Sequence, residues 1–274
     1  MKKYQPSTQN SSHKRIIPKK SLGQNFLTSP HVKNKIIAAC ELKSTDTILE
    51  IGPGQGALTK LIAPDVAQVI AIEKDHSLAM QLHEEYRDTN VQIINDDILD
   101  YPFESLPKNL KVIGNLPYNV ATPIIEKSLH HRAHFSSFYM TVQLEHGQRM
   151  NAKPHNKDYG SLSCFVQYYA DVKMLFRIPP TAFYPAPNVQ SCFMKMSFPD
   201  SLRLKAKDEE FLFKIIRQAF QQRRKNVLNA LSTNIEREDL LILLEKLQIN
   251  PQLRPENLGL KDYIALSDLM LETS

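Results

Sequence analysis

Apolar residues in the first two thirds of the chain follow two different periods. Short apolar runs, typical of strands buried on both faces of a sheet, occupy residues 47–51, 68–73, 91–94, 111–114 and 138–142. Around and between them, apolar residues recur at helical spacing over residues 31–42, 57–63, 76–86 and 123–129. Strands that alternate with helices in this way predict an α/β fold with a doubly wound, mostly parallel sheet.

The pattern changes after residue 172. Residues 173–178 and 191–198 have the pattern of two further strands, which a proline-rich loop connects. From Phe211 onward the spacing is helical, and the polar residues 199–207 precede this helical part. We therefore predict three parts: a basic N-terminal arm at 1–20, a sheet domain at 21–199 and a small helical domain at 200–274.

Composition excludes several classes of protein. No apolar run reaches the roughly 18 residues of a transmembrane helix, and the polar N-terminus lacks the apolar region of a secretory signal. Cys40, Cys164 and Cys192 are far apart, which argues against a disulfide framework or a cysteine-based zinc site. His130 and His134 have helical spacing but lack the carboxylate of a zinc-binding HExxH motif. We predict a cytoplasmic protein without a bound metal.

Positive charge is concentrated at the N-terminus. Residues 1–40 contain eight Lys and Arg residues and no Asp or Glu, although the formal net charge of the whole chain is only +5. A basic arm on a slightly acidic body suggests a polyanionic partner whose phosphates the arm contacts. A solvated tail would have the same composition, so the arm alone does not decide between the two.

A glycine-rich loop follows the first predicted strand. Its sequence, Glu50-Ile51-Gly52-Pro53-Gly54-Gln55-Gly56, has the spacing GxGxG rather than the GxGxxG of dinucleotide-binding proteins. Glu73 ends the second strand, where its carboxylate would accept hydrogen bonds from a ribose, and Asp97 follows the third, where it would reach an adenine edge. Because the carboxyl ends of parallel strands form the usual ligand crevice, these residues together predict a site for S-adenosylmethionine.

A second motif, Asn115-Leu116-Pro117-Tyr118, follows the fourth strand. The lone pair of the exocyclic amine of adenine is delocalised into the ring, which makes this amine a poor nucleophile. The side-chain oxygen of Asn115 and the Leu116 carbonyl would accept its two hydrogens, and Pro117 would fix the turn. Tyr118 offers an aromatic face on which an extruded base can stack. The motif predicts methylation of adenine N6.

These motifs resemble those of the 16S ribosomal RNA adenine N6,N6-dimethyltransferases, and the resemblance covers nearly the whole chain. The matching segments are 20–27, the glycine loop, 114–119, 158–160, 179–189 and 219–225. The resemblance implies a class I Rossmann-like methyltransferase sheet with a small C-terminal helical domain that binds rRNA. It also implies dimethylation of two adjacent adenosines in the 3′-terminal hairpin loop of 16S rRNA, late in assembly of the 30S subunit, by a monomeric enzyme.

The resemblance also assigns individual residues. The residues that it implies for S-adenosylmethionine binding are Asn25, Leu27, Gly52, Glu73, Asp97 and Asn115. It implies that Phe183 faces Tyr118 across the target base. The family often has Lys after the residue equivalent to Gln143, where this chain has Leu144, so the rRNA contacts of the following helix are open.

Arg223, Arg224 and Lys225 form a cationic cluster that interrupts an apolar helical pattern. In an enzyme that acts on nucleic acid, we interpret this cluster as an rRNA contact. An exposed helix C-terminus is the alternative, because cations are also favoured there.

Three rival functions share some of these motifs. A 23S rRNA adenine methyltransferase has the same cofactor and base pockets, but the match at 219–225 and around Phe183 favours the 16S enzymes. In an assembly checkpoint, binding would matter more than methylation. A DNA amino-methyltransferase is disfavoured because the sequence shows no obvious DNA-reading helix.

Overall fold

The computed structural model describes residues 3, 18–19, 22–199, 201–232 and 235–273. They form two compact units, of which one combines Met1–Gly147 with Lys173–Phe198 and the other combines Gln148–Val172 with Pro199–Ser274. The sheet domain predicted at 21–199 runs through 148–172, which the structure instead groups with the C-terminal helices. The predicted basic arm at 1–20 lies almost entirely outside the described residues.

A seven-stranded sheet with the order β4-β3-β2-β5-β6-β9-β7 forms the centre of the first unit. Its strands are β2 (Thr47–Ile51), β3 (Gln68–Glu73), β4 (Val91–Asn95), β5 (Leu110–Asn115), β6 (Phe135–Gln143), β7 (Asp171–Ile178) and β9 (Ser191–Ser197). The strands β4, β3, β2, β5 and β6 are parallel to one another, and β9 is antiparallel to β6. The predicted α/β fold with a mostly parallel sheet is confirmed.

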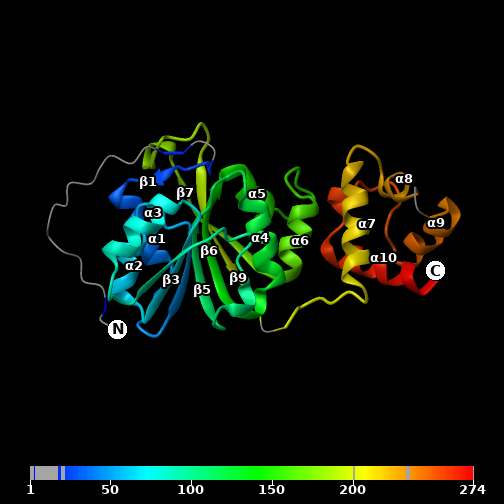
Figure 1. Cartoon of the computed structure of the whole chain (residues 1–274). Coiled ribbons are helices and arrows are strands. Elements are labelled where there is room, and N and C mark those ends of the chain that lie inside the picture. Colours follow the sequence, from blue (N-terminus) through cyan, green and yellow to red (C-terminus); the bar gives the residue numbers. More distant parts are fainter. Residues whose placement is uncertain (1–2, 4–17, 20–21, 200, 233–234, 274) are drawn as a thin grey trace. The chain divides into compact units, whose positions relative to one another are not determined.

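The sheet winds in opposite directions on the two sides of strand β2. The chain passes from β2 through β3 to β4 on one side and from β5 to β6 on the other. The helices of this unit are α1 (Pro30–Ala39), α2 (Thr59–Ile62), α3 (His76–Glu85) and α4 (Ala121–His130). Figure 1 shows α1, α2 and α3 on one side of the strands and α4 on the other. A ligand crevice is expected where the winding reverses, beyond the carboxyl ends of β2 and β5.

A short antiparallel ribbon joins two distant segments of this unit. Its strands are β1 (Phe26–Leu27) and β8 (Phe183–Tyr184), with Phe26 opposite Tyr184 and Leu27 opposite Phe183. The backbone N–H groups of Thr28 and Ser29 donate to the Ala182 carbonyl at 2.8 and 3.2 Å. The ribbon therefore attaches residues 26–29 to the segment that precedes β9.

The second unit is helical. Its helices are α6 (Ser161–Tyr169), α7 (Glu209–Gln221), α8 (Val227–Leu231), α9 (Arg237–Lys246) and α10 (Leu260–Thr273), and α5 (Leu144–Asn151) crosses the boundary between the units. The hydroxyl of Tyr169 donates to Glu209 at 2.6 Å, and the rings of Phe165 and Phe213 lie 5.0 Å apart. These contacts join α6 to α7 and explain why residues 148–172 belong to this unit.

Two details of the helices differ from the sequence prediction. The helix predicted at 57–63 is shorter, because α2 contains only Thr59–Ile62 before a 3₁₀ turn. Helix α6 was not predicted, since its sequence SLSCFVQYY has apolar and aromatic residues on nearly every side. Within the described part of the chain, no helix is both long and apolar enough to cross a bilayer.

Candidate active site

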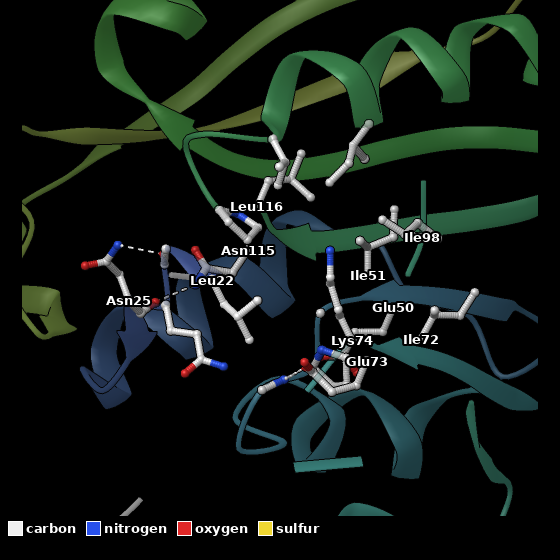
Figure 2. Close-up of a pocket in the computed structure, with 18 of the residues that line it drawn as sticks. Leu22, Asn25, Glu50, Ile51, Ile72, Glu73, Lys74, Ile98, Asn115 and Leu116 are labelled. Atoms are coloured by element: carbon white, nitrogen blue, oxygen red, sulfur yellow. Dashed lines mark hydrogen bonds between the residues drawn. The ribbon is translucent and has the colours of Figure 1, made fainter. Parts of the chain in front are cut away.

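A pocket opens at the carboxyl ends of β2, β3 and β5, where the winding of the sheet reverses (Figure 2). The structure places nine of the predicted residues in its lining: Asn25, Leu27, Gly52, Glu73, Asp97, Asn115, Leu116, Pro117 and Tyr118. These residues come from five segments of the sequence that only the folded sheet brings together. The apolar side chains of Ile51, Ile72 and Ile98 lie beside them (Figure 2).

The glycine loop approaches the pocket through backbone that only glycine adopts easily. Gly52 and Gly54 have φ values of 65° and 60°, in the left-handed region. A Cβ atom on Gly54 would lie 3.1 Å from the Phe26 ring, whereas a Cβ on Gly52 would meet no atom within 4 Å. A side chain at Gly54 would therefore crowd Phe26, and Gly52 leaves open space beside the pocket.

Glu73 supports this loop. Its carboxylate is buried and accepts hydrogen bonds from the backbone N–H groups of Gly54 at 2.9 Å and Asp75 at 2.8 Å. Burial raises the pKa of Glu73, although these two hydrogen bonds act in the opposite direction. Each oxygen retains a second lone pair, so the carboxylate can still accept a hydrogen bond from a ligand.

Asp97 also has protein partners. Its carboxylate accepts from the Lys74 ammonium at 2.5 Å and from the Leu99 N–H at 3.0 Å. Burial opposes the charged form of Asp97, but these hydrogen bonds outweigh it and lower the pKa. Lys74 was not predicted from the sequence. It follows Glu73 directly, and its side chain lies beside that of Glu73 in the pocket lining (Figure 2).

Glu50 is a pocket residue to which sequence reasoning gave no role of its own. Its side chain is 2% exposed, and Oε2 has no hydrogen-bond partner among the described residues. Burial, with a contribution from the nearby Glu73 carboxylate, raises the pKa of Glu50 to about 7. A buried carboxylate with an unpaired oxygen in a ligand pocket suits a ligand that carries positive charge.

We expect Glu50→Gln to change the pH dependence of stability. Because the folded-state pKa is raised, the native protein binds more protons than the unfolded chain between about pH 4.5 and 7, and wild type loses stability as pH rises through this window. Glu50→Gln has no carboxyl group to ionise and so lacks this loss of stability. The free energy of unfolding of the variant minus that of wild type should therefore rise by up to about 3 kcal/mol between pH 5 and pH 8. Denaturant titrations without ligand would measure this, and a pH-independent difference would contradict it.

Asn115 has a fixed orientation. Its Nδ2 atom donates to the backbone carbonyl of Asn25 at 2.9 Å, and these residues lie side by side in Figure 2. Since that carbonyl can only accept, the other end of the amide is the oxygen, and Oδ1 is left to accept a hydrogen bond from a ligand. The Leu116 N–H donates to the Thr141 carbonyl at 3.2 Å, which ties the start of the turn to β6.

Tyr118 is held by its hydroxyl group. This group lies 2.6 Å from the hydroxyl of Ser191, which is completely buried at the start of β9. Burial raises the pKa of Tyr118, so the phenol stays neutral and does not act as a base at physiological pH. Ser191 therefore orients the ring in the pocket wall, a role that sequence reasoning did not assign.

The structure does not bring Phe183 to the pocket. Its side chain is 4% exposed and belongs to a hydrophobic core that also contains its cross-strand partner Leu27. The neighbouring Tyr184 is 52% exposed, because successive residues of a strand point to opposite faces. A position of Phe183 opposite Tyr118 across the base is therefore not seen here.

The cationic cluster lies in the second unit, and its members differ. The Arg223 guanidinium donates to the carbonyls of Lys157 at 2.7 Å and Tyr159 at 3.0 Å, so this side chain supports the loop before α6. Arg224 and Lys225 are exposed, and neither forms an ion pair within the described part of the chain. Their role in RNA binding remains a prediction.

The segment that leads into β1 is also attached beside the pocket. Asp75 is 4% exposed, and its carboxylate accepts from the Lys19 ammonium at 2.8 Å and the Gln24 amide at 3.2 Å. Asp75 also caps α3 by accepting from the Ser77 N–H. Burial opposes its charge, but the hydrogen bonds from Lys19 and Gln24 prevail and lower the pKa of Asp75. Gln24 thus fixes the chain next to the residues that wall the pocket.

Solved structures share this fold. A dimethyladenosine transferase from Plasmodium falciparum is 25% identical and superposes with a TM-score of 0.78 over 88% of this chain and 95% of its own. The 23S rRNA methyltransferase ErmE, at 22% identity, superposes with a TM-score of 0.70 over 89% of this chain and 98% of its own. The sheet order and the pocket at its reversal point, together with these likenesses, define a class I Rossmann-like methyltransferase.

Sequence comparison then identifies a family within this class of methyltransferases. The family model for ribosomal RNA adenine dimethylase matches residues 17–271. Ribosomal RNA small subunit methyltransferase A of Streptococcus thermophilus is 38% identical over 267 residues, which cover 93% of this chain and 92% of that protein. Its counterpart in Streptococcus pyogenes is 39% identical over the same length. The chain belongs to the ribosomal RNA adenine dimethylase family, and the predicted activity, dimethylation of rRNA adenine, is confirmed.

Proposed function

We propose that this enzyme dimethylates N6 of two adjacent adenosines in the 3′-terminal hairpin loop of 16S rRNA, within the 30S subunit or its precursor. It acts as a cytoplasmic monomer with S-adenosylmethionine as methyl donor. The observation that carries the proposal is the single pocket in which the glycine loop, Glu73 and Asp97 meet the Asn115–Tyr118 turn. Relatives named as small-subunit methyltransferases support 16S rRNA as the substrate.

The lining of the pocket fits the different parts of S-adenosylmethionine. The open space beside Gly52 accommodates ligand atoms, and the lone pairs of Glu73 accept from ribose hydroxyls. The unpaired oxygen of Glu50 suits the positive charge that the methionine part carries. Ile72 and Ile98 would provide apolar surface for the adenine ring, and Asp97 would reach its edge. When bound, S-adenosylmethionine supplies an electrophilic methyl group.

The turn after β5 prepares the target amine. Asn115 Oδ1 accepts one N6 hydrogen and the Leu116 carbonyl accepts the other, which favours a tetrahedral nitrogen whose lone pair is available for attack. Pro117 stiffens the turn that presents the carbonyl. The Tyr118 ring holds the extruded base by its face. N6 becomes acidic as it gains the methyl group and releases its proton afterwards, so no strong base is required.

The stacking role of Tyr118 predicts a graded series of variants. Tyr118→Ala should weaken capture of the target by about 1–3 kcal/mol, the usual value of a stacked base. Tyr118→Phe should lose much less, and Ser191→Ala should behave like Tyr118→Phe because both remove the same hydroxyl contact. Single-turnover methylation over a range of enzyme concentrations would measure this. If Tyr118→Phe is as inactive as Tyr118→Ala, the hydroxyl rather than the ring face is essential.

Arg224 and Lys225 are expected to bind rRNA phosphates. Replacing both with Gln should reduce the slope of log affinity against log salt by about 1.4, the value for two single-strand phosphate contacts. Cofactor affinity should not change. Arg223 is left intact because it also donates to the backbone carbonyls of Lys157 and Tyr159, so that its loss would disturb the loop before α6 as well as any RNA contact. An unchanged slope would mean that the two residues belong to an ordinary solvated helix end and do not contact rRNA phosphates.

The direct test of the function uses labelled S-adenosylmethionine with undermethylated 30S and 50S particles. We expect methyl groups on two adjacent adenosines near the 3′ end of 16S rRNA, identified by mass spectrometry of rRNA fragments. Incorporation into 23S rRNA instead would support the rival enzyme. A catalytically inactive variant that still restores assembly in a deletion strain would favour the checkpoint role.

A further inference from the structure

A second concave surface lies beside the active site, on the same unit. We call it the cationic hollow, and its lining includes Ser29, His31, Lys35, Phe176, Arg177 and Thr181. His31, Lys35 and Arg177 are exposed, and no described residue of the lining is acidic. The proposed chemistry of methyl transfer uses none of these residues. We propose that the cationic hollow binds the sugar–phosphate backbone of the rRNA strand next to the target adenosines, an inference that rests on the proposed function.

The first argument is electrostatic. The hollow forms between α1 and β7, and residues 18–40 and 172–198 contain no Asp or Glu. Some other exposed or half-exposed cations of this protein are paired with carboxylates, as Lys195 is with Glu41 and Lys74 is with Asp97. Within the described part of the chain, Lys35 and Arg177 form no ion pair. Their charge is therefore available to a polyanion.

The second argument is the arrangement of the side chains. The Lys35 ammonium lies 4.2 Å from the centre of the Phe176 ring, a cation–π contact that orients the ammonium group. Phe176 packs in turn against Phe193 of the sheet, with ring centres 5.3 Å apart. The cation is thus held on a rigid base rather than on a freely moving surface side chain. A cation that is held in place in this way favours the binding of a phosphate group at one defined position.

The third argument is the position of the hollow along the substrate path. Leu27 lines the methyl-transfer pocket and Ser29 lines the hollow, so their Cα atoms lie within about 7.6 Å of each other. Ala182, which also lines the hollow, binds the backbone of Thr28 and Ser29. At about 3.4 Å for each stacked nucleotide, two or three nucleotides span this distance. Because the two cavities adjoin along this stretch of wall, a strand that enters the pocket can place its next phosphates in the hollow.

The test compares wild type with Lys35→Gln/Arg177→Gln. Lys43→Gln/Lys108→Gln is a matched control, since both of its lysines are exposed and precede β2 and β5, at the opposite edge of the sheet from the pocket. Binding to undermethylated 30S particles is measured between about 50 and 200 mM salt. We expect the slope of log affinity against log salt to fall by about 1.4 in the first variant only. Cofactor affinity, measured by calorimetry, should stay unchanged in both and confirms folding.

The outcomes separate this proposal from the proposed function. If wild type methylates 16S rRNA but the Lys35/Arg177 variant keeps the wild-type slope, the hollow does not bind the strand. If both double variants lose the same slope, the effect is one of general charge and the proposal is overturned. If wild type binds particles but methylates no 16S rRNA, the proposed function fails, while a reduced slope confined to the Lys35/Arg177 variant still supports an RNA site in the hollow.

Discussion

Asn115→Ala is expected to lower the single-turnover rate of methylation by about 10²–10³-fold at saturating enzyme, the loss typical of one oriented polar contact to a reacting centre. The reason is the orientation of the amide, whose nitrogen donates to the Asn25 carbonyl and whose oxygen is left to accept from the proposed substrate. An interaction made only in the transition state lowers the maximal rate, whereas a uniform binding contact raises the half-saturating concentration. Rapid-quench experiments with 30S particles distinguish the two.

Two controls are needed for this variant. Gln92→Ala removes an exposed amide from β4 of the same sheet and should leave the rate unchanged. Calorimetry with S-adenosylmethionine shows how far the loss of Asn115 also affects the cofactor. If the maximal rate of Asn115→Ala is normal and only the half-saturating concentration rises, the amide binds the base without activating it.

Glu73→Ala should weaken the binding of S-adenosylmethionine by about 1.5–3 kcal/mol, or roughly 10- to 150-fold in Kd. The variant removes the proposed acceptor for the ribose and at the same time releases the backbone N–H groups of Gly54 and Asp75. Both losses act on the same pocket, because Gly54 belongs to the glycine loop and Asp75 holds the segment before β1. Titration calorimetry measures the effect directly.

The matched control is Asp65→Ala, which removes an exposed carboxylate from the 3₁₀ turn after α2. It should bind the cofactor as wild type does. Circular dichroism and the thermal midpoint show whether Glu73→Ala remains folded. A folded variant with unchanged affinity would mean that Glu73 only supports the loop and does not contact the ligand.

The sequence predicted the parallel sheet and the position of the pocket because both depend on local features. Apolar runs mark the strands, and residues such as Gly52, Glu73 and Asn115 stand at strand ends, which a parallel sheet must gather at one edge. The same reasoning found the family, since its motifs are contiguous in sequence. These parts of the prediction needed no knowledge of long-range contacts.

The features that were missed depend on contacts between distant residues. The bond between Tyr118 and Ser191 spans 73 residues, and no local pattern reveals it. Phe183 and Tyr184 have similar propensities, so the sequence does not show which one faces the core. Residues 148–172 join the helical unit through aromatic packing on α7. The polar residues 199–207 suggest a domain boundary that lies after these residues, so the sequence does not reveal this packing.

The hydrogen bond from Asn115 to the Asn25 carbonyl gives the start of the chain control over the polarity of the active site. Ninety residues separate the two partners, yet this hydrogen bond decides which end of the amide is left for a ligand. If the segment around Asn25 withdraws, the amide can rotate and present its NH₂ group to the adenine amine, so that two donors oppose each other. The enzyme would then keep an intact base pocket but lose the acceptor that activates N6. The position of the Asn25 carbonyl and the presence of an acceptor for N6 are thus coupled through a single hydrogen bond.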